Sequence, residues 1–485
     1  MNNTLAAAFA ALIAIATPAV AADDAAFRRD FGAFLNAGMK RYPTLPAVAV
    51  AVVRHDAPII VTARGMADRT MGRAAGADTR FYIASSTKSF VALALVRLAK
   101  KGAIDLDSTL AELAPDIAFA TGVQADKVTL RHLLSHSHGL SGDALQFRLA
   151  YSGAWDEATL WRLLGGLTPN AKAPLGSFAY SNLGYNVAAL LVERRLKRPW
   201  QAIVEQEVIA PLRLRDTAAR GLAKPADRAL PYDGLTPLYL RKTDRTMQSA
   251  GGMESSARDM ARWLSANLAA ERGGKGGLAA ALRTTHAQFV ATSDDFGPFN
   301  RTGHGFGWYR GPWHGEILLH SFGGFAGFRA HASFLPTRDL GVAALSNDDG
   351  AGYWLVDIAA AYAYDWYRDG AAAAQAAAET RLKALDTRLA EAAAKVKPAA
   401  APQFSLAATA YAGRFCNADW GTVTVTARTT GLDLTMGALH AAATGDAPDT
   451  VRAELIPGQR LKFAFAVESE KVAALTALGS RFARC

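Results

Sequence analysis

The interpretation of this chain starts from the stretch FYIASSTKSF, residues 81–90, in which a serine hydroxyl and a lysine amine stand three positions apart. An apolar run over 90–100 follows and ends before Gly102, a pattern typical of a buried helix with a glycine stop. Side chains three apart share one helical face, so the Lys88 amine can reach the Ser85 hydroxyl and activate it. The tetrapeptide alone carries little weight, because a chain of this length contains Ser-x-x-Lys about once by chance and serine often merely caps a helix.

The segments around this stretch predict an α/β protein of the α+β type, with a central antiparallel sheet flanked by helices and an inserted helical region. β-rich runs precede it and follow it, at 47–53, 59–61, 305–309, 316–320, 328–335 and 340–345. Residues 106–240 alternate helical segments with loops rich in Gly, Pro and Ser, and 352–368 indicates a closing helix. The simplest assembly is one sheet whose strands come from both ends of the domain, with the helices inserted between them.

The C-terminal part changes character and predicts a second unit. Residues 371–403 are rich in alanine and then contain proline, which indicates a partly helical linker. Residues 404–485 alternate short β-rich runs with turns, as in a small C-terminal antiparallel β-barrel. The only two cysteines, Cys416 and Cys485, lie near its two ends. In a closed barrel the first and last strands are neighbours, so the two cysteines could form a disulfide. The sequence alone leaves open whether they do so or remain free thiols.

The first residues predict export. Residues 1–22 run from a polar head through an apolar segment to a small-residue sequence, which is the pattern of a cleaved signal peptide. The head carries no lysine or arginine, so an N-terminal membrane anchor is the alternative. We therefore expect a mature first domain over 23–370 that is periplasmic or secreted.

The composition limits the classes of binding partner that we expect for this protein. The chain has 485 residues, of which 51% are hydrophobic, and a formal net charge of +10. The basic residues are scattered in short clusters without a stripe of interleaved aromatics, which argues against nucleic acid. Peripheral association with an anionic cell envelope remains a possible partner interaction, and the oligomeric state is left open. The expected partner is a small-molecule or peptide substrate.

A second chemical element follows downstream in the segment PLGSFAYSNLGY, residues 174–185. A phenol near an ammonium group can act as a proton shuttle, as Tyr180 would here, and the Asn182 amide can hold a substrate carbonyl and orient a lysine. These surroundings resemble those of the β-lactamase-related serine hydrolases, which include class C β-lactamases, D-alanyl-D-alanine carboxypeptidases, D-aminopeptidases and esterases.

The resemblance spans roughly residues 46–347 and rests on several blocks in the same order. These blocks are 81–90, 101–107, 130–136, 174–185, 250–253 and 334–347. By this likeness Ser85 is the nucleophile, Lys88 and Tyr180 are its proton-transfer partners, and Asn182 positions the substrate. The C-terminal unit resembles, less closely, the lipocalin-like domains that are often fused to these hydrolases. The resemblance implies acyl transfer without a metal or an organic cofactor.

The chain departs from the family at the third motif, a strand that carries Lys, His or Trp, then any residue, then Gly. Aligning the segment HSFGGFAGF, residues 320–328, places Ser321 at the first position and His320 one residue early. Only one of them can face the cleft in a regular strand, and the register favours Ser321, whereas His320 would need a bulge. By the same register Gly323 fills the motif and the Gly324 amide joins that of Ser85 in an oxyanion hole.

A smaller departure is His138, which follows His132 and His136. Three nearby histidines raise the question of a metal site, because catalytic zinc needs three protein ligands presented together. The family pattern accounts for the first two as structural, and no acidic or cysteine ligand stands at useful spacing. We therefore expect no metal.

Together these features predict an exported serine hydrolase that acts through an acyl-enzyme on an ester or amide bond. D-amino-acid peptides and β-lactams are candidate substrates, although a serine at the third motif lacks the positive charge that would hold a substrate carboxylate. The alternative is a penicillin-binding-like envelope protein that captures a ligand and turns over poorly.

Overall fold

A large antiparallel sheet forms the centre of the first unit. The computed structural model describes residues 24–55, 57–221, 228–395 and 400–485, so the predicted signal peptide lies outside the described residues. Within these ranges the sheet has nine strands. In spatial order they are β10 (Val290–Phe296), β11 (Phe299–His304), β12 (Tyr309–Trp313), β13 (Glu316–Gly324), β14 (Arg329–Leu335), β15 (Leu340–Ser346), β1 (Ala47–Arg54), β2 (Ala57–Asp68) and β3 (Arg73–Ala74).

This sheet brings together the two ends of the domain, as the sequence predicted. β1 pairs with β15 across almost 300 residues of sequence, with Val50 opposite Ala344. One expected strand is misplaced: residues 305–308 lie outside any strand, with a bend at 306–307, and β12 begins only at Tyr309. Gly307, with φ +78°, lies against the backbone of Ser89, where a side chain would collide with α2. The apolar residues of 305–308 therefore serve packing next to a bend, a use that β-propensity does not distinguish from a strand.

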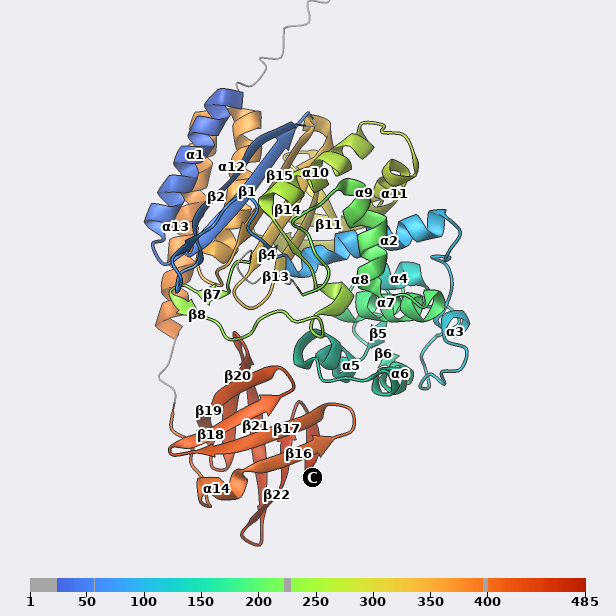
Figure 1. The fold of residues 1–485 in the computed structure, drawn as a ribbon, viewed down its shortest axis with the longest axis vertical. Coiled ribbons are helices and arrows are strands. Elements are labelled where there is room, and N and C mark those ends of the chain that lie inside the picture. Colours follow the sequence, from blue (N-terminus) through green and yellow to red (C-terminus); the bar gives the residue numbers. More distant parts are fainter. Residues whose placement is uncertain (1–23, 56, 222–227, 396–399) are drawn as a thin grey trace, which may run out of the picture.

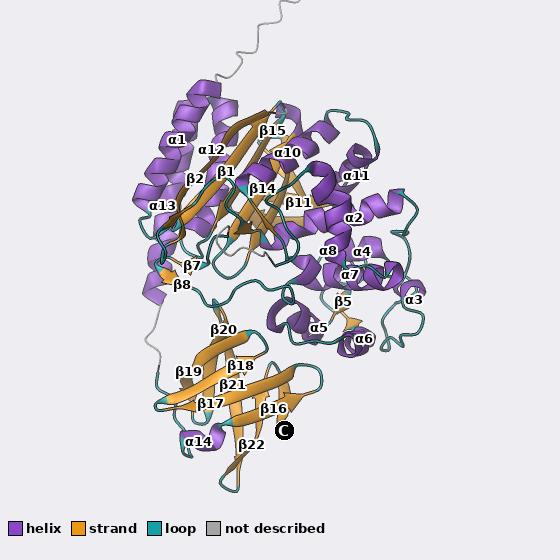
Figure 2. Ribbon diagram, in the orientation of Figure 1, coloured by secondary structure: helices purple, strands orange, loops and turns teal. Residues whose placement is uncertain are grey.

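Helices cover both faces of the sheet (Figure 2). One face carries α1 (Asp24–Arg41), α12 (Gly352–Asp369) and α13 (Ala371–Lys395), and the other carries α2 (Thr87–Lys100), α10 (Ala257–Glu271) and α11 (Gly277–His286). β1 shows why the sequence requires both layers. Ala47, Ala49 and Ala51 point into the core on the α2 side, whereas the valines between them point into the core on the α12 side. Alternate residues of a strand face opposite sides, so a strand that is apolar at every position must be covered twice.

The inserted helical region lies beside α2 and forms a second lobe of the first unit (Figure 1). Its helices are α3 (Leu110–Leu113), α4 (Leu130–Leu134), α5 (Asp143–Phe147), α6 (Glu157–Gly165), α7 (Asn182–Leu196), α8 (Trp200–Val204) and α9 (Ala210–Leu212). Short two-stranded pairings lie outside the main sheet: β4 (Phe81–Tyr82) with β9 (Glu254–Ser255), β5 (Leu140–Ser141) with β6 (Thr168–Pro169), and β7 (Tyr232–Asp233) with β8 (Thr236–Pro237). The β4–β9 pair brings the 81–90 stretch next to the 250–253 block.

Residues 371–395 belong to the predicted partly helical linker, and they are helical throughout. These residues form α13, which packs against α12 and buries Ala374, Ala378, Leu382 and Leu385. The Arg41 guanidinium of α1 also donates to α13 carboxylates. Alanine is the strongest helix former, and an apolar stripe at helical spacing buries readily against a neighbouring helix, so alanine richness here marks a packed helix.

The C-terminal unit is a closed antiparallel barrel, as predicted, and it lies below the inserted region in Figure 1. Its strands are β16 (Gly413–Asn417), β17 (Gly421–Arg428), β18 (Gly431–Met436), β19 (Leu439–Ala447), β20 (Thr450–Ile456), β21 (Gln459–Glu468), β22 (Lys471–Ala477) and β23 (Ser480–Arg484), preceded by the short helix α14 (Ala408–Tyr411). The barrel is consistent with the expected lipocalin-like unit.

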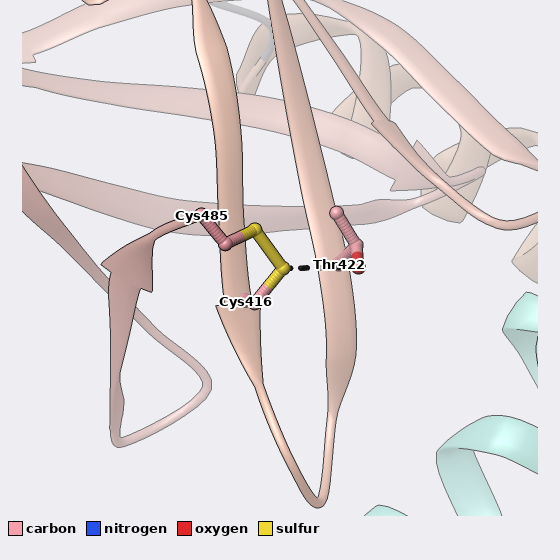
Figure 3. The surroundings of a disulfide bond; sticks show 3 residues. All are labelled: Cys416, Thr422 and Cys485. Carbon is pink, nitrogen blue, oxygen red and sulfur yellow. Dashed lines mark hydrogen bonds between the residues drawn. A yellow bond between two sulfur atoms is a disulfide. The ribbon is translucent and has the colours of Figure 1, made fainter.

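Closure of the barrel pairs β16 with β23 and brings the two cysteines together (Figure 3). Cys416 and Cys485 form a disulfide with their Cα atoms 5.9 Å apart. The pairing that the sequence left open is thus present, because barrel closure makes the first and last strands neighbours. Among the described helices, none is both long and apolar enough to cross a membrane.

Candidate active site

Ser85 lies in a tight turn at the entrance of α2. The 3₁₀ turn Ala84–Ser86 directly precedes α2, and Ala84 has a left-handed backbone with φ +43°. Such a conformation is costly for a residue with a Cβ and is found most often where function requires it. β13 lies directly against this turn: a Cβ on Gly323 would lie 1.9 Å from the Ile83 carbonyl oxygen and 3.0 Å from the Ser85 nitrogen. Only glycine permits this close approach between β13 and the turn that carries Ser85.

Lys88 is held one helical turn further along α2, as the spacing predicted. Its side chain is buried, and its Nζ lies 3.1 Å from Ser85 Oγ. The same nitrogen donates to Asn182 Oδ1 at 2.8 Å and to the Ala250 carbonyl oxygen at 2.7 Å. Burial lowers the pKa of Lys88 well below its ordinary value. A neutral amine has two N–H bonds and one lone pair. Asn182 Oδ1 and the Ala250 oxygen can only accept hydrogen bonds, so they accept both N–H bonds of the amine. The lone pair is then directed at the Ser85 hydroxyl.

The 250–253 block has a definite task in this arrangement, since Ala250 supplies one of the two oxygen acceptors. Its backbone is fixed by Asn186, whose Oδ1 accepts from the Ala250 amide at 3.0 Å and from the Ser249 hydroxyl at 3.2 Å. Gly252 folds back so closely that a Cβ there would lie 2.6 Å from the Gln248 carbonyl oxygen. Asn186 was not singled out from the sequence, because a single asparagine inside a helix carries no distinguishing pattern.

Tyr180 stands on the other side of Ser85. Its side chain is 37% exposed, and Lys88 Nζ lies 4.9 Å from the centre of its ring. Burial of the hydroxyl raises the pKa of Tyr180 to about 12, although a hydrogen bond with Ser85 and the charge of Arg301 act in the opposite direction. The phenol therefore keeps its proton at neutral pH. This favours Lys88 as the base and leaves Tyr180 as a proton relay or donor.

The backbone next to Tyr180 is anchored by His136. Its Nδ1 accepts from the Ser181 amide at 3.2 Å, and its ring packs on the Tyr180 ring with centroids 4.5 Å apart. Burial holds the pKa of His136 well below its usual value, so the ring is neutral and can accept this bond. Ser181 then caps α7 through a bond from the Leu183 amide, which places Asn182 at the first turn of the helix.

The third motif is set by the register of β13, which pairs with β14 without interruption. His320 stands opposite Ser333, whose hydroxyl bonds to Tyr364 of α12, so His320 belongs to the α12 face of the sheet. Ser321 stands opposite Ala332, which packs in the core on the α2 side, the same side on which Gly323 meets Ser85. The sheet therefore places Ser321 and Gly323 toward the nucleophile, and it buries His320 completely on the other face.

A buried cation lies near β13. Arg301 of β11 is 3% exposed, and its Cζ lies 3.8 Å from the ring centres of both Phe296 and Tyr309. Its Nε donates to His320 Nε2 at 3.2 Å, and its Nη1 pairs with Asp294 at 2.8 Å. Arg301 is therefore buried and paired beside His320, and its charge acts on Tyr180 by lowering the pKa of that phenol. A lone arginine in a strand gave no sequence signal for this position.

The three neighbouring histidines do not converge. His132 Nδ1 accepts from the Thr129 amide in a helix-capping box, and His138 Nδ1 accepts from the Leu140 amide. Burial lowers the pKa of His138 to about 4. Within the described residues, the structure contains no cluster of three or more His, Cys, Asp or Glu side chains that could hold a metal ion.

Comparisons with known proteins agree with this geometry. The beta-lactamase family model matches residues 35–365. The chain is 32% identical over 236 residues to esterase EstB of Burkholderia gladioli, covering 46% of this chain and 59% of the relative. It is 22% identical over 307 residues to the protein flp of Staphylococcus aureus strain COL, covering 62% of this chain and 60% of the relative. The chain thus spans about 60% of the length of the curated relatives it matches.

Solved structures share the fold. The octameric penicillin-binding protein homologue from Pyrococcus abyssi aligns over 94% of this chain and 99% of its own, with a TM-score of 0.60 and 18% identity. The D-alanine carboxypeptidase AmpC from Burkholderia cenocepacia aligns over 67% of this chain and 95% of its own, with a TM-score of 0.55 and 20% identity. The family match covers more than half of the sequence and includes Ser85, Lys88, Tyr180 and β13. The chain belongs to the beta-lactamase family, with a closed barrel added at its C-terminal end.

Proposed function

We propose that this protein is a serine hydrolase that cleaves an ester or amide bond through an acyl-enzyme on Ser85. The observation that carries this proposal is the environment of Lys88. A buried amine with a lowered pKa gives its two N–H bonds to Asn182 Oδ1 and the Ala250 oxygen, and its remaining position faces Ser85 Oγ. A structural lysine would gain nothing from lying 3.1 Å from a hydroxyl that it could deprotonate.

The reaction follows from this arrangement. Lys88 takes the proton of the Ser85 hydroxyl, and the alkoxide attacks the substrate carbonyl carbon. The resulting oxyanion is stabilised by the backbone amides of Ser85 and Gly324. Collapse of the tetrahedral intermediate breaks the scissile bond, and the leaving group takes the proton from Lys88 directly or through Tyr180. Water activated by the same groups then hydrolyses the acyl-enzyme and restores Ser85.

For the substrate we propose an ester in preference to a carboxylate-bearing peptide or β-lactam. Ser321 stands where the family motif has Lys, His or Trp, so no cationic side chain at this position holds a carboxylate. The similarity to a protein named as an esterase supports the same choice.

From the sequence of residues 1–22 we further propose that the protein is exported and acts in the periplasm or outside the cell.

Covalent labelling tests the assignment of the nucleophile. The purified protein is treated with a fluorophosphonate probe, or with a penicillin, and its intact mass is recorded. We expect one adduct on the parent protein and none on Ser85→Ala. The matched control is Ser86→Ala, because Ser86 is the next residue and its hydroxyl is buried without a hydrogen-bond partner among the described residues. Equal labelling of Ser85→Ala and the parent protein would show that Ser85 is not the nucleophile.

A substrate panel separates the hydrolase from a ligand-binding protein. p-Nitrophenyl esters, D-amino-acid anilides and nitrocefin are offered to the same preparation, and steady-state rates are measured. We expect the highest kcat/KM for an ester. A folded protein that retains ligand tightly but turns over none of the three would instead be the binding protein.

A further inference from the structure

The barrel contacts the segment that adjoins the catalytic residues. In this segment Arg148–Ser152 forms a π-helical turn that follows α5. Arg148 donates to the carbonyl oxygens of Asp419 and Ala418, in the turn between β16 and β17, at 2.5 Å and 3.0 Å. At the other end of the segment, the Ala438 amide of the β18–β19 turn donates to the Ser152 carbonyl oxygen at 2.8 Å. Two barrel turns therefore hold the two ends of five residues.

The segment held in this way carries a side chain that reaches the catalytic centre. Burial raises the pKa of the Tyr151 phenol, and hydrogen bonding with the Asn182 side chain acts in the opposite direction, so the two groups lie close together. The Tyr151 ring also packs between Phe147 and Phe325, with centroids 6.1 Å away in both cases. Phe147 in turn meets the barrel residue Trp420, edge to face, at 5.5 Å. A continuous series of contacts thus leads from the barrel to the amide that binds Lys88.

The barrel also contacts the opposite side of the cleft. The β13–β14 hairpin turns at residues 325–328, immediately after Gly324. Ala326, at the tip of this turn, is 8% exposed and belongs to the hydrophobic core of the barrel, and Phe325 packs against that core. Ala326 has a left-handed backbone with φ +42°, a conformation that surrounding contacts must maintain in a residue with a Cβ.

We propose that the C-terminal barrel is a working part of the active site, in which its β16–β17 and β18–β19 turns hold Tyr151 as a positioning residue for Asn182. Lys88 needs the oxygen of the Asn182 amide, not its nitrogen, because only the oxygen can accept a Lys88 N–H bond. A bond between the Asn182 nitrogen and the Tyr151 hydroxyl prevents the amide from turning over. π-Helical turns are frequent at functional sites. This inference rests on the hydrolase proposed above.

The test uses the full chain and a double-mutant cycle. Tyr151→Phe removes only the hydroxyl, and Trp420→Ala removes the barrel contact with Phe147, far from the reacting atoms. We expect each variant to lower kcat for a p-nitrophenyl ester about tenfold with little change in KM, because a small misplacement of catalytic groups mainly affects the chemical step. Since both changes act through Asn182, the double variant should be about as slow as the slower single variant.

A milder variant and a control address folding. Arg162→Gln removes bonds to Asp419 Oδ1 and the Ala418 oxygen from a half-exposed side chain, so it loosens the same barrel turn without opening the core. The control is Arg428→Gln, which breaks the exposed Arg428–Asp433 pair within the barrel. We expect a lower kcat for Arg162→Gln and none of this effect for the control. Independent, multiplying effects of Tyr151→Phe and Trp420→Ala would overturn the proposal.

A second readout does not depend on activity. Backbone hydrogen exchange of residues 148–152 is followed in the parent protein, Arg162→Gln and Arg428→Gln. Faster exchange in Arg162→Gln alone supports the role of the barrel, and unchanged exchange contradicts it. If the parent protein is never acylated at Ser85, the proposed hydrolase fails, but the exchange experiment still decides whether the barrel holds this segment.

Discussion

At the scale of single residues, the chemistry depends on which atoms surround the Lys88 amine. Asn182 Oδ1 and the Ala250 oxygen are uncharged, so they fix the amine without stabilising its protonated form as a carboxylate would. Burial then dominates and lowers the pKa of Lys88. The neutral base needed for acylation is therefore a consequence of uncharged partners in a buried site.

Asn182→Asp tests this argument through pH dependence. Acylation requires neutral Lys88, so kcat/KM rises with pH through the pKa of Lys88. A carboxylate at the position of an oxygen 2.8 Å from Nζ favours the ammonium form and raises that pKa. We expect the acidic limb of the profile to move to higher pH by about one unit or more, and the rate at pH 7 to fall accordingly.

The control for this variant is Gln146→Glu. Gln146 Oε1 accepts from Ser181 and Leu183 at the start of the same helix but does not bond to Lys88. Its substitution introduces a similar charge nearby, so it should move the acidic limb much less. A profile for Asn182→Asp that coincides with that of the parent protein would mean that Lys88 is not the base.

At the scale of elements, α13 shows that a sequence of linker composition can be part of a core. Leu382 and Leu385 are 5% and 4% exposed, and Asp386 accepts bonds from Arg41 and Tyr42 of the opposite end of the chain. The helix therefore closes the layer on the α12 face of the sheet. Its position fixes where the connection to the barrel begins.

Leu385→Ala measures this packing. Removing a buried leucine side chain costs both its transfer free energy and the cavity left behind, so we expect the free energy of unfolding to fall by about 3 kcal/mol. The control, Lys383→Ala, alters an exposed position of the same helix and should change stability by less than about 0.5 kcal/mol. Urea unfolding of both variants provides the comparison, and equal values would mean that α13 is only loosely attached.

At the scale of the whole molecule, two units of different construction meet beside the nucleophile. The sheet domain supplies Ser85, Lys88, Tyr180 and β13, and the barrel supplies turns that hold the segment around Tyr151. The stability of the barrel therefore matters for the site. A disulfide between Cys416 and Cys485, which lie 69 residues apart in sequence, covalently joins the two ends of the barrel.

The double variant Cys416→Ser/Cys485→Ser tests this covalent link. A cross-link that closes a loop of this length restricts the unfolded chain, so its removal should cost the barrel about 4 kcal/mol. Calorimetry should show the barrel unfolding at a lower temperature in the variant, and addition of a thiol reductant should produce the same shift in the parent protein only. A parent protein whose unfolding is unaffected by reduction would show that the disulfide contributes no stability.

Much of the fold and of the site could be predicted from the sequence, because the signals concerned are local. The spacing of Ser85 and Lys88, the alternating core residues of β1 and the register of residues 320–324 are all properties of short segments with a fixed geometric period. The ordered blocks from 81 to 347 were sufficient to identify the family that the match over residues 35–365 shows.

What the sequence by itself determined about this protein is the pair of Ser85 and Lys88 on one helix face, the two-unit construction and the family. Only the tertiary structure decided which side chains surround that pair: Ala250 and Asn186 behind the amine, Arg301 near β13, and Tyr151 held by the barrel. It also decided that α13 is core and that the cysteines are paired. The reason is physical. These contacts join residues far apart in the chain, and their distances depend on how sheets, helices and a closed barrel pack, which no local period encodes.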